Sequence, residues 1–169
     1  MSDVTDWDIY EKMIQDLVRD ALNELGEKVE EVIKQYIQQD VYDFGDDKRK
    51  SYKPTGEFKE SIKSVPLVSK PNNPEVLIGS HGGSMKTYEP ENYIHGSIWG
   101  RNGTEYEEDV RNYLAEILAF NTSGDLFGTN RWWHNRDSYW YNALEHLKSG
   151  GWLNKEFKKI LKSKGLDVK

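Results

Sequence analysis

The chain has 169 residues, 36% of them apolar and 31% charged, and a formal net charge of −6. A chain of this length has room for one domain with its own core, residues 1–169, and not for a second full domain. Because the chain contains no cysteine, disulfides, thiolate metal sites and cysteine-based catalysis are excluded.

The N-terminal quarter of the chain predicts a long amphipathic helix over residues 6–41. Apolar residues recur there at helical spacing, beginning with Ile9, Met13 and Leu17 and continuing to Ile37. Gly26 lies near the middle of this segment, where glycine costs about 1 kcal/mol relative to alanine. The sequence therefore leaves a bend, or a break into two helices, open at Gly26.

The run Pro54-Thr-Gly-Glu-Phe-Lys-Glu-Ser-Ile62 predicts a sharp change of chain direction followed by a short helical turn. Proline provides a rigid entry, and glycine lets the backbone reverse before two apolar side chains dock. We expect Thr55, Gly56, Phe58 and Ile62 to form a structural corner. An ordinary helix start is compatible with the same residues.

Residues 63–80 predict a β-hairpin. Val65 and Leu67 on the first arm, and Val76 and Ile78 on the second, alternate with polar residues, so we expect one buried and one solvated face. The following residues 81–104, rich in glycine, serine, asparagine and tyrosine, predict an irregular insertion.

Helical spacing returns in the C-terminal part, residues 105–165. One helix is predicted over residues 105–121. A second starts at a cap formed by Asp137 or Ser138 and ends at Gly150-Gly151, and a third, over residues 153–164, is closed by Gly165. The expected fold class is therefore α+β, with a long N-terminal amphipathic helix, a small antiparallel β-sheet and further helices in the C-terminal half.

Charge is distributed unevenly along the chain. Residues 1–47 hold 14 acidic and 4 basic residues, a net charge of −10, whereas residues 155–169 hold 6 lysines and 2 acidic residues, a net charge of +4. Such polarity suits head-to-tail contacts in which the acidic end of one copy meets the basic end of the next. Two solvated helix faces would give the same pattern.

An aromatic and basic block precedes the second C-terminal helix and forms our candidate interface. Its members are Arg131, Trp132, Trp133, Arg136, Tyr139 and Trp140. Rings of this kind occupy protein cores or interface hot spots, and both interpretations stay open. His134 stands three residues before Asp137, but no second carboxylate cluster or third metal ligand is nearby. We expect a structural histidine, and no catalytic residue, cofactor or metal site.

Three segments in this order resemble the tail-completion, or head-tail joining, proteins of tailed bacteriophages. They are the long N-terminal helix running into Pro54-Thr-Gly-Glu-Phe-Lys-Glu-Ser-Ile62, the segment Ala115-Glu-Ile-Leu-Ala-Phe-Asn-Thr-Ser-Gly124, and the aromatic block leading into Tyr141-Asn-Ala-Leu144. The family's Arg-Pro-Phe motif is replaced here by Arg131-Trp-Trp-His-Asn-Arg136, and residues 81–104 are longer than the usual connection. The resemblance covers roughly residues 10–150.

The resemblance implies a structural virion protein of the phage neck and no enzymatic activity. It further implies a homo-oligomeric ring around the DNA channel, with the connector or adaptor and the tail terminator or tail tube as partners. A tail terminator protein and a nucleic-acid-binding phage protein remain the alternatives, and passing contact with genomic DNA is compatible with the basic C-terminal tail. Without a signal sequence or membrane span, we expect a soluble protein assembled in the host cytoplasm.

Overall fold

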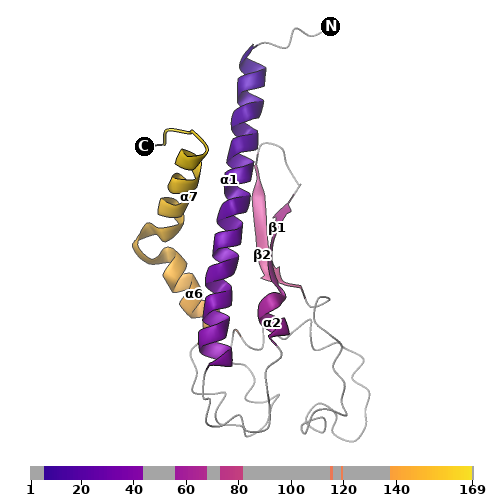
Figure 1. The fold of residues 1–169 in the computed structure, drawn as a ribbon, viewed down its shortest axis with the longest axis vertical. Coiled ribbons are helices and arrows are strands. Elements are labelled where there is room, and N and C mark those ends of the chain that lie inside the picture. Colours follow the sequence, from indigo (N-terminus) through magenta and orange to yellow (C-terminus); the bar gives the residue numbers. More distant parts are fainter. Residues whose placement is uncertain are drawn as a thin grey trace, which may run out of the picture. The chain divides into compact units, whose positions relative to one another are not determined.

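The computed structural model describes residues 6–43, 56–67, 73–81, 115, 119 and 138–168. The elements are α1 (Asp6–Ile37), a π-helical turn η1 (Gln38–Tyr42), α2 (Glu57–Glu60), β1 (Ile62–Leu67), β2 (Glu75–Ser80), α6 (Tyr139–Lys148), a 3-10 turn η8 (Ser149–Gly151) and α7 (Trp152–Ser163). The two strands pair in one antiparallel sheet (Figure 1). This confirms the predicted α+β class. The insertion predicted over residues 81–104 lies outside the described residues except for His81.

These elements belong to two compact units. Unit 1 comprises the described residues within Met1–Val32, Lys63–Ile78 and His146–Lys169, and unit 2 comprises those within Ile33–Ile62 and Gly79–Glu145. Helix α1 is a single α-helix from Asp6 to Ile37 (Figure 1). The bend or break left open at Gly26 is therefore not present.

Gly26 instead provides space for the hairpin. A Cβ atom placed on Gly26 would lie 2.7 Å from Cγ1 of Val76 and 3.3 Å from Cβ of Ser64. Both distances are shorter than ordinary van der Waals contact, so the two strands approach the helix backbone at a point where any side chain would collide. The lower helix propensity of glycine is the cost of this close packing.

The edge of β1 is held to α1 by Glu30. Its Oε2 accepts the backbone N–H of Ser64 at 2.7 Å, and its Oε1 lies 3.8 Å from Nζ of Lys63. Alternate N–H groups of an edge strand point away from its partner, so Pro66, two residues after Ser64, occupies a position where a missing N–H breaks no bond between the strands.

The two faces of the hairpin differ in burial from the predicted pattern. The backbone N–H of His81 donates to the carbonyl of Ser61 at 2.8 Å, and continuing this antiparallel register places Val65 opposite Leu77. Val76 is half-buried toward Gly26, whereas Val65 and Leu77 are 36% and 54% exposed on the opposite face. The prediction that Val65 shares the buried face with Val76 is wrong, because the strand register assigns them to opposite faces.

Helix α7 packs along α1 in unit 1 (Figure 1). Ala21 of α1 and Ile160 and Leu161 of α7 are buried together, and smaller contributions come from Val18, Leu25, Phe157, Leu166 and Val168. Two ion pairs, Lys28 with Glu156 at 3.0 Å and Lys164 with Glu24 at 3.3 Å, border this contact. Hydrogen bonds from Lys159 and Lys28 hold the pKa of the Glu156 carboxyl below its ordinary value.

Both ends of the C-terminal helices follow the predicted signals. Ser138 precedes α6, and its Oγ accepts the backbone N–H of Tyr141 at 3.3 Å. Gly150 and Gly151 both have positive φ angles between α6 and α7, and Gly165 has φ +87° after α7. The N–H groups of Gly165 and Leu166 bond back to Lys162 and Leu161, which is the hydrogen-bond pattern of a Schellman cap.

Replacing Gly26 by alanine should destabilise the protein. The gain in helix propensity is about 1 kcal/mol, but overpacking against Val76 costs about 1–3 kcal/mol, so we expect a lower midpoint in urea unfolding. In a Val76→Ala background the clashing Cγ1 is gone, and the same glycine substitution should become less harmful. Equal losses in both backgrounds would contradict this account of the contact.

Candidate functional site

The predicted structural corner lies in unit 2, where α1 ends. Gly56 has φ +84° and precedes α2, and Phe58 and Ile62 are 5% and 3% exposed. Thr55, the fourth member, lies outside the described residues. Gly56 thus provides the sharp reversal, because a positive φ is strained for residues with a side chain, and the two apolar residues that follow it are buried.

Phe58 is the centre of this corner. Its ring meets the ring of Tyr139, at the start of α6, edge to face with centroids 5.8 Å apart and planes at 78°. Such pairs contribute about 0.5–1.5 kcal/mol beyond their burial. Tyr139 is only 2% exposed, and its hydroxyl donates to the carbonyl of Ala115 at 3.1 Å. Tyr139 is therefore a core residue of unit 2.

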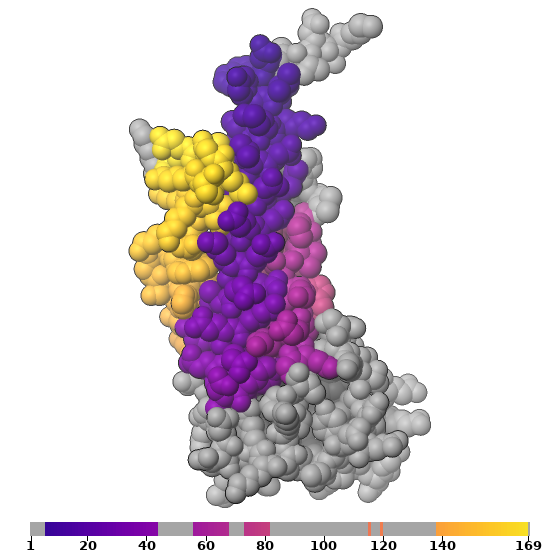
Figure 2. Space-filling model, viewed as in Figure 1, coloured from indigo at the N-terminus to yellow at the C-terminus, as the bar shows by residue number. Residues whose placement is uncertain are grey.

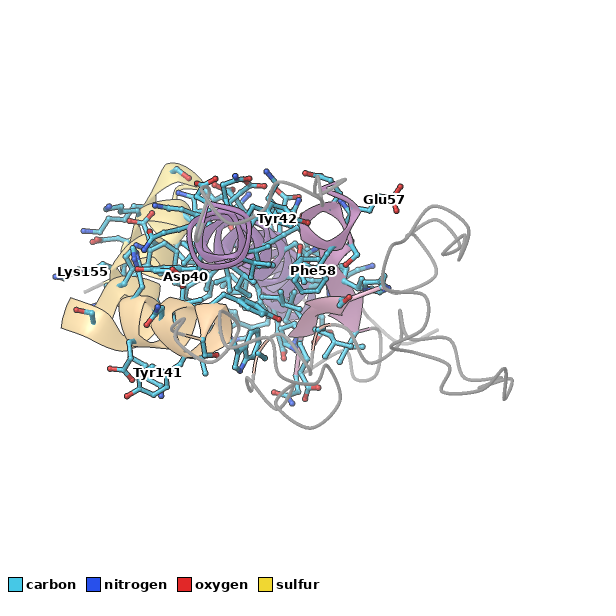
Figure 3. The ribbon with its side chains drawn as sticks, turned by 90° about the horizontal axis from the view of Figure 1, so that it is seen from below. Asp40, Tyr42, Glu57, Phe58, Tyr141 and Lys155 are labelled. Carbon is cyan, nitrogen blue, oxygen red and sulfur yellow. The ribbon has the colours of Figure 1, made fainter. Side chains whose placement is uncertain are left out.

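Tyr42 completes the start of α2. Gly56 has no side chain to cap this helix, and the hydroxyl oxygen of Tyr42 accepts the backbone N–H of Lys59 at 3.2 Å instead. Figure 3 shows Tyr42 and Phe58 where the end of α1 meets α2. Burial raises the pKa of Tyr42 above its ordinary value, against the opposing effect of the backbone N–H groups of Lys59 and Phe58.

The π-helical turn η1 places Asp40 in the interior. The N–H of Asp43 bonds to the carbonyl of Gln38 at 2.8 Å, five residues back, which widens the last turn of the helix. Asp40 is 7% exposed and accepts a hydrogen bond from Nδ2 of Asn142 on α6 at 2.9 Å. A buried carboxylate needs such a partner, so this bond fixes which face of α6 meets the end of α1.

Asp40, Tyr42 and Asn142 are not among the residues predicted from the sequence. A signal was present, since Asp40 interrupts the apolar stripe of Ile33, Ile37 and Val41 on one face of the predicted helix. A carboxylate in that position calls for a buried donor. Asn142 could not be identified as that donor from sequence, because 102 residues separate the two side chains.

The structure describes two of the six residues of the candidate interface. Arg131, Trp132, Trp133 and Arg136 lie outside the described residues. Of the remaining two members, Tyr139 is buried and Trp140 is half-buried. On the same helix, Tyr141 is 64% exposed and points away from α1 (Figure 3).

In the described part of the chain, no group of three or more His, Asp or Glu side chains is placed so that it could hold a metal ion. His146 packs edge to face on Trp152, with ring centroids 5.9 Å apart. His134 and Asp137 lie outside the described residues. None of the helices that the structure describes combines the length and apolar content needed to cross a bilayer.

Phe58→Ala should destabilise the protein by about 3–5 kcal/mol, because it removes a buried ring together with its contact to Tyr139. Thermal unfolding followed by circular dichroism measures the loss. Tyr141→Ala, which removes an exposed ring, is the matched control and should change stability by no more than about 0.5 kcal/mol. Equal effects of the two substitutions would contradict the assignment of Phe58 to the core.

Tyr42→Phe should make stability less sensitive to alkaline pH. A tyrosine with a raised folded-state pKa stabilises the fold fully below its unfolded pKa of about 10 and loses this contribution as pH rises through the folded value. At pH 8 the variant should be less stable by about 1 kcal/mol, because the N–H of Lys59 loses its acceptor. The difference from wild type should shrink above pH 10. A constant difference in urea unfolding at pH 8 and pH 11 would contradict this.

Searches of the chain against protein-family models, curated protein sequences and solved structures find no match.

Proposed function

We propose that this chain is a structural protein of the neck of a tailed bacteriophage, which completes the tail or joins head to tail by assembling into a ring. The resemblance of Pro54-Thr-Gly-Glu-Phe-Lys-Glu-Ser-Ile62 and the segments around it supports the family. The function is assembly and not catalysis, and its partners are further copies of the chain, the connector or adaptor, and the tail terminator or tail tube.

The observation that carries this proposal is the exposed apolar surface at the start of α1. Trp7, Ile9, Tyr10, Met13 and Ile14 are between 44% and 79% exposed. Side chains of this size have on the order of 150–250 Å² of surface each, so together they expose on the order of 500 Å². Apolar patches of this extent are often functional, and this one supports a contact with another protein surface.

A tail terminator role is the alternative within the same particle, since tail terminators are also short α+β proteins that form rings. The exposed start of α1 suits either role. The two roles differ in the neighbours of the ring, so the position of the chain in the particle separates them.

In a phage that carries this coding sequence, a nonsense mutation within it should leave DNA-filled heads and separate tails, and electron microscopy of the lysate detects both. Wild-type protein supplied in trans should restore joined particles. Trp7→Ala/Tyr10→Ala should fail to restore them although the protein folds, whereas Tyr141→Ala should succeed. Normal infectious particles from the nonsense mutant would refute the proposal.

Deletion of residues 155–169 is not a suitable test of the basic tail. Ile160 and Leu161 are 2% and 7% exposed and pack against Ala21, so the deletion removes a core contact together with the lysines. Substitution of exposed lysines on α7 separates charge from folding.

A further inference from the structure

The uncovered apolar surface continues a face of α1 that is covered further along the helix. Val18, Ala21 and Leu25 contact α7 and the residues after it. On a helix with 3.6 residues per turn, Trp7, Tyr10 and Ile14 lie on this same face. In Figure 2 the indigo start of α1 extends beyond the yellow C-terminal residues that cover the following turns. We name residues 6–20 the arm.

Acidic side chains border the apolar surface of the arm. A shallow, open hollow on the arm is lined by Ile9, Met13 and Leu17, with Asp8, Asp16, Asp20 and Lys12 around it. Residues 6–20 hold five acidic and two basic residues, a net charge of −3. The surface that covers the arm must therefore combine apolar or aliphatic contact with positive charge.

Helix α7 presents a surface of this kind on the side opposite its contact with α1. Lys155, Lys158, Lys159 and Lys162 recur at intervals of three and four residues, are exposed, and form what we name the lysine stripe. Within the described residues no carboxylate pairs with Lys155, Lys158 or Lys162, whereas Lys159 pairs with Glu156. Including Glu156, α7 has a net charge of +3.

The lysine stripe cannot contact the arm of its own chain. Ile160 and Leu161 occupy the opposite face of α7 and pack on α1, so the lysines point away from the helix that forms the arm. Lys155 extends away from the helices in Figure 3. A contact between arm and lysine stripe therefore joins two different chains.

We propose that the arm of one copy docks on the lysine stripe of a second copy of this chain. Lysine stems provide aliphatic contact for Ile9, Met13 and Leu17, while their ammonium groups reach the aspartates around the same hollow. Trp7 and Tyr10, which are 79% and 55% exposed, lie on the part of the arm's surface next to this hollow, and their ring faces attract further ammonium groups. Docking two arms on one another would instead bring two surfaces of charge −3 together.

Each copy carries one arm and one lysine stripe, so this contact is head to tail. A head-to-tail contact repeats from chain to chain and produces a ring when the rotation closes. The inference rests on the self-assembly proposed above and specifies the two surfaces that carry it.

The test reverses charge on each surface in the full-length protein and measures oligomer mass by analytical ultracentrifugation. The arm variant is Asp16→Lys/Asp20→Lys, which avoids the first helical turn where acidic residues stabilise the helix dipole. The stripe variant is Lys155→Glu/Lys158→Glu, whose residues are exposed on α7. Circular dichroism and thermal unfolding show that both variants fold.

We expect wild type to self-associate, more weakly at high salt, and each variant alone to associate at least about tenfold more weakly. An equimolar mixture of the two variants should recover association, because each reversed surface then meets its complement. Trp7→Ala should weaken association at least about tenfold without a change in unfolding midpoint, whereas Tyr141→Ala should not.

Other outcomes overturn the inference in distinguishable ways. A wild-type chain that stays monomeric at all concentrations refutes the self-assembly itself. Wild-type association that both variants retain refutes the arm-to-stripe contact but leaves self-assembly intact. Stronger association of the arm variant with wild type than of wild type alone indicates arm-to-arm pairing. Loss of duplex-DNA binding in the stripe variant, with self-association unchanged, assigns the lysines to nucleic acid.

Discussion

The close contact between the backbone of α1 at Gly26 and the hairpin is the constraint on which unit 1 depends. Only hydrogen fits between the helix and Val76, and Glu30, one turn later, binds the N–H of Ser64 on the neighbouring strand. A two-stranded sheet is only marginally stable by itself, so the hairpin needs this support from the helix. Once one face of the sheet packs against α1, the strand register directs Val65 and Leu77 to the other face.

A second set of interactions organises unit 2 at the end of the same helix. The wide turn η1 directs Asp40 toward Asn142 and Tyr42 toward the start of α2. Phe58 and Tyr139 are buried in contact with each other, and the polar bonds determine which faces meet. Removal of one partner of a buried polar pair is costly, so the pairing of Asp40 with Asn142 opposes alternative packings of α6.

The proposed assembly follows from what these packing arrangements leave uncovered. Helix α1 is longer than the segment that α7 covers. The uncovered part, the arm, carries large apolar side chains with acidic side chains beside them. Burial of such side chains is favourable by about 25 cal/mol per Å², so a partner surface of suitable charge gains from covering them. The same helix that supports the hairpin thereby supplies a surface for a neighbouring subunit.

The sequence by itself determined the elements whose signals are local. Apolar spacing predicted α1 and the two C-terminal helices, and Ser138, Gly150, Gly151 and Gly165 marked their ends. Phe58 and Ile62 were identified as residues that dock, and both are buried. The course of α1 at Gly26, the faces taken by Val65 and Val76, and the packing of the basic C-terminal segment on α1 depended on contacts between distant residues. Only the tertiary structure decided these, because a glycine's neighbour, a strand's register and the partner of a buried carboxylate are set by packing between segments that the chain brings together on folding.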